Sequence, residues 1–133
     1  MNYKDLNVYQ RAYKVAIDLH IYLEKNASKF TQEELNRVRN LSREVLGCIA
    51  EGCSQRTAKA KRFFNFRALD ALHALQLDID FLHDIRRLQD EQFQHFNEEY
   101  DICSKQLYKF NRSILDNASA PKEQPAAAEA VAA

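Results

Sequence analysis

Two Asp-x-x-His pairs are the residues of this chain whose types and spacing come nearest to a catalytic or metal site. Asp70 lies three residues before His73, and Asp80 lies three residues before His83. Helical bundles use a carboxylate and an imidazole at this spacing in di-iron sites, with the pairs on facing helices. Here both pairs fall within one predicted helix. We therefore interpret them as surface charge. The alternative is a metal site in which His73 meets its copies across an oligomer axis.

The remaining reactive side chains form no catalytic constellation. Cys48 and Cys53 are not in a Cys-x-x-Cys motif, and Cys103 falls on an apolar helix face, so we expect reduced thiols with structural roles. The sequence has no glycine-rich phosphate loop and no Ser-His-Asp signature. We expect no catalytic activity and no cofactor. The competing class is a metal enzyme built on the two Asp-x-x-His pairs.

The stretch between Glu51 and Asp70 has no acidic residue and concentrates positive charge. Phenylalanines are interleaved with its cations, which are Arg56, Lys59, Lys61, Arg62 and Arg67. The stretch lies where one predicted helix ends and the next begins, and helix N-termini favour phosphate. A basic helix start bearing aromatic residues predicts a nucleic-acid contact, with RNA or DNA as the partner. The alternatives are that these charges pair between subunits or only solvate the surface.

The composition predicts an all-α protein. The 133 residues include two Gly and two Pro, which are too few to form the turns between several strands. Four segments repeat apolar residues at the alternating three- and four-residue spacing of a helix. Their expected ranges are Lys4 to Lys25, Thr31 to Gly52, Thr57 to Leu88 and Asp90 to Asn117. Short connections between such helices predict an antiparallel up-and-down four-helix bundle.

Local signals predict how the second helix begins and ends. Thr31 and Glu34 have the spacing of a capping box, in which each side chain accepts a backbone N–H of the other residue. Gly52 is expected to end the helix in a left-handed conformation.

The C-terminal residues differ in composition from the predicted bundle. Residues 118–133 are rich in Ala, Pro and Glu and have no large apolar residue beyond Val131, so we expect a disordered tail after a bundle domain of residues 1–117. No apolar run is long enough to span a membrane, and no secretory signal is visible at the N-terminus. We expect a cytoplasmic protein that does not contact membranes.

The third predicted helix has a second apolar row opposite its core-facing row. A surface helix should be polar on that side, and burying each large apolar side chain is worth roughly 1.5–3 kcal/mol. We therefore predict an oligomer interface formed by Phe63, Phe66, Leu77, Phe81, Ile85 and Leu88. Tyr9, Tyr13 and Ile17 similarly widen the apolar face of the first helix. The alternative is that a neighbouring helix of the same bundle covers part of this row.

Charge is unevenly distributed along a chain whose total is neutral. The sequence has 19 basic and 19 acidic residues. Residues 37–67 carry eight bases and two acids, whereas residues 78–101 carry eight acids and two bases. In an antiparallel bundle these stretches place the second-to-third connection and the start of the fourth helix at opposite ends. We expect an electrically polarised protomer, and a ring of protomers would gather the basic ends at one rim.

Three stretches of the chain resemble a family of bacterial four-helix bundle proteins. They are YKDLNVYQRAY at residues 3–13, IAEG at residues 49–52 and KRFFNF at residues 61–66, the last followed by AL at 68–69. In order and spacing they resemble the proteins first noticed as products of intervening sequences in 23S ribosomal RNA genes. The resemblance covers roughly residues 3–115. Leu46, Cys48 and Ala74 stand where that family commonly has proline, asparagine and glutamate, so no role is carried over to these positions.

The resemblance implies a four-helix protomer that assembles as a homopentamer. It also implies kinship to the accessory proteins of diversity-generating retroelements, which bind nucleic acid and a reverse transcriptase. The function expected is thus a non-enzymatic oligomeric scaffold that contacts nucleic acid through a basic rim. The alternative is a purely protein-binding structural scaffold of unassigned role, whose polarised ends recruit an acidic or basic partner such as a reverse transcriptase or another protein.

Overall fold

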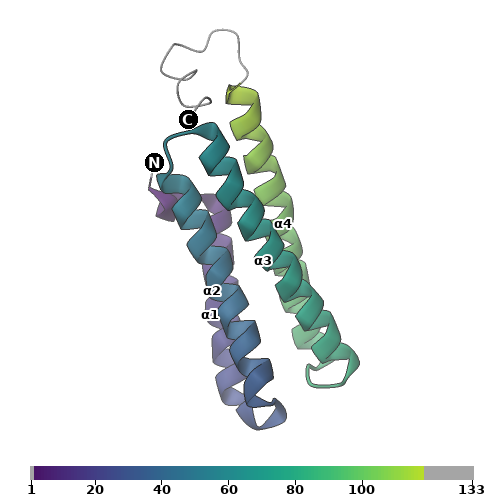
Figure 1. The fold of residues 1–133 in the computed structure, drawn as a ribbon. Helices are drawn as coiled ribbons and strands as arrows, with labels where there is room; N and C mark the ends of the chain where they lie inside the picture. Colours follow the sequence, from purple (N-terminus) through teal and green to yellow (C-terminus); the bar gives the residue numbers. More distant parts are fainter. Residues whose placement is uncertain (1, 119–133) are drawn as a thin grey trace.

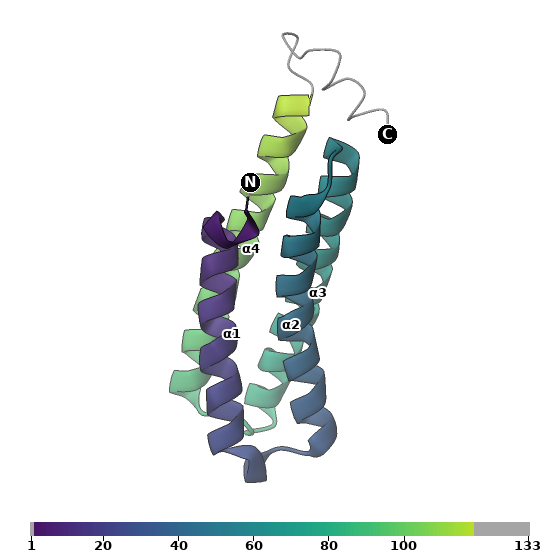
Figure 2. The ribbon, with the colours of Figure 1, turned by 90° about the vertical axis from the view of Figure 1, so that its left-hand side faces the viewer.

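Four long helices run up and down beside one another in the computed structural model, which describes residues 2–118 (Figures 1 and 2). No strand occurs in that range. The helices are α1 (Asn7–Lys25), α2 (Gln32–Ser54), α3 (Ala58–Asp84) and α4 (Asp90–Ala118), with short 3-10 turns η1 (Tyr3–Asp5) and η2 (Ala27–Lys29). The predicted all-α four-helix fold is confirmed. The predicted tail, apart from Ala118 at the end of α4, lies outside the described residues.

Each helix packs on its neighbours in sequence, and α1 and α4 close the ring. α1 and α3 each pack on both α2 and α4, so they lie diagonally across the bundle. The α2–α3 turn and the last turns of α4 lie at one end of the bundle, whereas the α1–α2 and α3–α4 connections lie at the other (Figure 1). The helices of residues 2–118 all lack the combination of length and apolar character that crossing a membrane requires.

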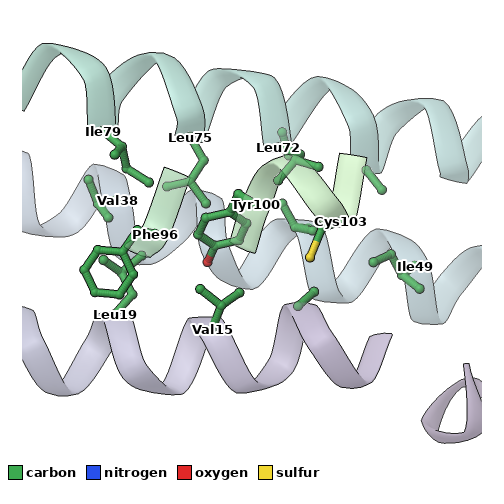
Figure 3. Close-up of a cluster of buried hydrophobic side chains, with 14 of the residues drawn as sticks. Val15, Leu19, Val38, Ile49, Leu72, Leu75, Ile79, Phe96, Tyr100 and Cys103 are labelled. Carbon is green, nitrogen blue, oxygen red and sulfur yellow. The ribbon is translucent and has the colours of Figure 1, made fainter. Parts of the chain in front are cut away.

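The core is filled by apolar side chains from all four helices. Figure 3 shows Val15 and Leu19 of α1, Leu75 of α3, and Phe96 and Tyr100 of α4 pointing towards a common centre. Phe96 and Tyr100 are the largest of the fully buried side chains. They occupy positions four apart on α4, as the predicted core row of that helix requires.

Threonine side chains cap the starts of α2 and α3. The capping box predicted at α2 is present: Thr31 Oγ1 accepts from the Glu34 N–H at 3.1 Å, and Glu34 Oε1 accepts from the Thr31 N–H at 2.9 Å. At α3, Thr57 Oγ1 accepts from the Ala60 N–H at 3.0 Å. Each cap satisfies a backbone donor that the helix itself leaves unpaired.

Gly52 does not end α2 in a left-handed conformation, so that prediction is wrong. The helix continues to Ser54, and Gly52 is buried inside it with no positive φ. A Cβ at this position would lie 3.1 Å from Asn65 Oδ1 and 3.2 Å from Phe64 Cβ. The missing side chain therefore allows α2 and α3 to approach closely, which is a packing role rather than a turn.

Leu88 does not lie on the outer row of α3, which corrects its assignment to the oligomer interface. α3 ends at Asp84, four residues earlier than predicted, and the chain turns through Arg86 at φ 67°. The N–H groups of Arg87 and Leu88 both donate to the Leu82 carbonyl, so the chain folds back under the bundle. This reversal buries Leu88 in the core at 4% exposure.

Candidate nucleic-acid interface

The predicted basic residues lie at the end of the bundle where α2 passes into α3 (Figure 1). Arg56 lies in the turn itself, and the other four lie in the first three turns of α3. Arg56 and Lys59 are exposed, and neither forms an ion pair within residues 2–115, whose side chains the structure describes. These two cations are the most accessible part of the predicted rim.

The other three rim cations also make contacts within the protomer. Lys61 Nζ donates to the Cys53 carbonyl at 3.2 Å and so caps the last turn of α2. Arg67 lies 3.8 Å from Glu44 across the α2–α3 interface, and its guanidinium lies 6.0 Å from the ring of Phe63. Arg62 is half-buried, and its Nε is enclosed without a hydrogen-bond partner in the part of the chain that the structure describes.

The last turns of α4 bring further cations to the same end. Lys105, Lys109 and Arg112 follow one another with no acid between Asp101 and Asp116. Lys105 pairs with Asp101 at 3.1 Å, whereas Lys109 and Arg112 are exposed. These residues were not predicted as part of the rim. They could have been predicted, because in an up-and-down bundle the end of the fourth helix lies at the same end as the turn between the second and third helices.

Acidic residues gather at the opposite end of the bundle, together with the cations Lys25, Lys29, Arg86 and Arg87. Asp84 ends α3, and Asp90 and Glu91 begin α4. His83 Nε2 lies 2.7 Å from Asp90 Oδ1, and its ring stacks on Phe93 at a centroid distance of 4.0 Å. The structure thus places the basic and acidic stretches at opposite ends, as the sequence predicted.

The two Asp-x-x-His pairs do not converge on a site. His83 contacts Asp90 rather than Asp80, and His73 Nε2 lies 3.3 Å from Ser104 Oγ. Asp70 and Asp80 are exposed. Across residues 2–115, no group of three or more His, Cys, Asp or Glu side chains is arranged to hold a metal ion.

His20 and Ser42 form a contact that the sequence did not suggest. His20 Nε2 lies 2.9 Å from Ser42 Oγ, and which of the two groups donates depends on the tautomer of the imidazole. Ser42 Oγ also lies 2.9 Å from the Arg39 carbonyl oxygen. Burial, followed by the charges of Arg43 and Arg39, lowers the pKa of His20. The pair links α1 to α2.

Two of the cysteines are buried thiols, Cys48 on α2 and Cys103 on α4. Burial raises the pKa of Cys103 to about 12, and burial likewise raises the pKa of Cys48. Thiols held in the protonated form are poor nucleophiles, which fits the structural role expected of these two residues.

Large apolar side chains are exposed on α1, α3 and α4, and those on α4 are Ile102, Tyr108 and Leu115. On α3 these are Phe63, Phe66, Leu77 and Phe81, and Ile85 follows at the C-cap of α3, so five of the six residues predicted for the interface are exposed. Leu77 is the most open at 67%. On α1 they are Tyr13, Ile17 and Ile21, each one turn from the next. The α3 row and the α1 row point away from the bundle in different directions, because the two helices lie diagonally.

Comparison with known protein families shows which family this chain belongs to. Residues 4–109 match the family described as 23S rRNA-intervening sequence protein. The chain belongs to this family. Comparison with curated proteins and with solved structures finds no match to the chain. The family match spans all four helices, including the basic turn and both exposed apolar rows, and the family's description names no catalytic activity.

Proposed function

We propose that this protein is a non-enzymatic scaffold that assembles into a homo-oligomer and contacts nucleic acid through its basic end. The observation that carries the proposal is the gathering of cations from α3 and α4 at one end of a chain with no net charge. Clustered Arg and Lys side chains displace the counterions that surround a phosphate backbone. A local cluster of cations can therefore bind nucleic acid even on a protein with no net charge.

The exposed apolar rows of α1 and α3 offer two different surfaces from which a ring of protomers can be built. A contact between the α3 row of one protomer and the α1 row of the next joins two different surfaces. Such a heterologous contact closes into a ring when the rotation allows. The family resemblance gives five as the number of protomers. In a ring all basic ends lie on the same rim, so the positive charge of one protomer is multiplied by the symmetry.

Binding of labelled single-stranded RNA and DNA tests this function. We expect binding at about 50 mM salt that weakens steeply by about 200 mM. The variant Arg56→Glu/Lys59→Glu should lose tenfold or more in affinity. Its matched control is Lys25→Glu/Lys29→Glu, which makes the same charge change on exposed residues at the opposite end. Absence of binding at low salt, or equal affinity of the two variants, would contradict the proposal.

A purely protein-binding scaffold is the second candidate. The acidic residues Asp84, Asp90 and Glu91, at the end opposite the basic rim, favour it, because a basic surface on a reverse transcriptase or another protein would complement them. This candidate gains support if the wild-type protein binds neither nucleic acid.

A further inference from the structure

A groove lies between the first turns of α3 and the last turns of α4. Its volume is about 690 Å³, and it opens to solvent. Arg62 and Phe66 line it from α3, and Tyr108, Asn111 and Arg112 are among the residues that line it from α4. It is the place where the predicted basic run meets the cations of α4 that were not predicted.

The charge of the groove is positive. Arg62, Lys109 and Arg112 line it, and none of the residues described along its walls is acidic. Among the side chains described, residues 2–115, ion pairs involve Lys105 and Arg67 nearby but none of these three cations. The groove therefore offers three cations to an anionic ligand.

The groove also offers aromatic surface. Phe66 is 52% exposed and Tyr108 is 53% exposed, one on each wall. Phe66, which the sequence assigns to the oligomer face, lies on the flank of α3 towards α4, so we leave it out of the α3 row that meets the next protomer. Cations beside open aromatic rings are the combination that binds single-stranded nucleic acid, because bases stack while phosphates meet the charges.

Two enclosed polar atoms of groove residues lack partners. Asn111 is only 6% exposed, yet its side-chain Oδ1 has no hydrogen-bond partner in the described part of the chain. Arg62 Nε, from the opposite wall, is likewise enclosed and unpaired. Both atoms are covered by protein, so neither faces a ligand in the groove, and the site depends on its cations and its exposed aromatic rings.

We propose that this groove binds one nucleotide of a single strand, with its phosphate on Arg62, Lys109 and Arg112 and its base against Phe66 and Tyr108. The groove site rests on the nucleic-acid contact proposed above and specifies where on the basic end the strand lies. A single strand suits the groove better than a duplex, because paired bases hide the faces that the two rings would contact.

Fluorescence anisotropy of a labelled oligouridylate of about ten nucleotides tests the site. Tyr108→Leu keeps an apolar side chain but removes the ring, and we expect about a tenfold loss of affinity. Tyr108→Phe keeps the ring and should bind as the wild type does. Lys109→Glu/Arg112→Glu should weaken binding tenfold or more and flatten its salt dependence, because fewer phosphates are neutralised. The matched control is again Lys25→Glu/Lys29→Glu.

The outcomes distinguish failure of the groove site from failure of the proposed nucleic-acid contact as a whole. If the groove variants bind as the control does while Arg56→Glu/Lys59→Glu loses binding, the groove site is wrong and the basic rim stands. If the wild-type protein does not bind the probe at low salt, both fail. Competition by polyglutamate as strong as that by unlabelled oligouridylate, with Tyr108→Leu unchanged, would mean an acidic protein ligand and would overturn the nucleotide site. All substituted side chains are exposed, and thermal melting checks that each variant folds.

Discussion

Two glycines on α2 have opposite roles, because one is buried against α3 and the other is exposed. A Cβ on Gly47 would have no atom within 4 Å, whereas a Cβ on Gly52 would lie within 3.2 Å of Phe64 and Asn65. Alanine favours a helix over glycine by about 1 kcal/mol. We expect Gly47→Ala to stabilise the protein by about 0.5–1 kcal/mol. For Gly52→Ala the overpacking cost of about 1–3 kcal/mol should exceed that gain.

Urea unfolding followed by circular dichroism measures both substitutions. Gly47→Ala serves as the control for Gly52→Ala, since both gain the same helix propensity. A Gly52→Ala variant as stable as Gly47→Ala would show that α3 moves away at no cost, and would contradict the close approach assigned to Gly52.

His20 should give the protein a stability contribution that depends on pH. Its pKa in the folded protein lies below the ordinary value of 6.5, chiefly because burial disfavours the charged ring. The unfolded chain therefore binds a proton at His20 more readily than the folded chain does. The contribution is present above about pH 6.5 and is lost progressively as the pH falls below that value.

An NMR titration of the imidazole protons tests this directly. We expect His20 to titrate below pH 6.5. His20→Gln keeps a hydrogen-bonding group for Ser42 and does not titrate, so it should lose less stability than the wild type between about pH 7 and pH 5. A His20 pKa at or above the ordinary value would contradict the burial of this ring against α2.

At the scale of the helix, the exposed rows on α1 and α3 should be equally necessary for assembly. We expect Leu77→Glu on α3 and Ile17→Glu on α1 each to dissociate the oligomer, because either would bury an unpaired charge. Both side chains are exposed in the protomer, so helicity should not change. Size-exclusion chromatography measures the effect. Asn36→Glu on α2, a helix with no exposed large apolar residue among those described, is the matched control.

The two variants show whether α1 takes part in the contact. If Leu77→Glu dissociates the assembly and Ile17→Glu does not, α1 takes no part in the contact, and α3 meets either a second α3 or the exposed apolar residues of α4. That result would refute the ring built from the α1 and α3 rows.

The helices could be predicted from the sequence because each core row repeats at helical spacing. Val8, Ala12, Val15 and Leu19 of α1 repeat at that spacing and are all buried. The ends of the helices were harder to predict. Leu88 continues the outer row of α3 in sequence, yet the turn at Arg86 redirects it into the core. Gly52 has the residue type of a helix end, but the position of α3 determines its role, and no local pattern encodes that position.

The candidate site was predicted in part for a similar reason. The run from Arg56 to Arg67 is contiguous and therefore visible in the sequence. Lys109 and Arg112 join it only through the fold, since more than forty residues separate Arg67 from Arg112. The groove between them depends on side chains from two helices, and spacing within either helix does not reveal it.

At the scale of the whole molecule, one neutral protomer has little long-range attraction for a polyanion. Its 19 basic and 19 acidic residues cancel, and the positive surface is confined to the end where the cations of α3 and α4 gather. Gathering several such ends on one rim raises the local potential without changing the net charge. The nucleic-acid contact therefore depends most on assembly.

Light scattering coupled to size-exclusion chromatography tests assembly most directly. The chain has a mass of 15.5 kDa. We expect a single species at an integral multiple of that mass, five copies according to the family resemblance, that persists on dilution. A monomer of 15.5 kDa at all concentrations would contradict the proposed assembly.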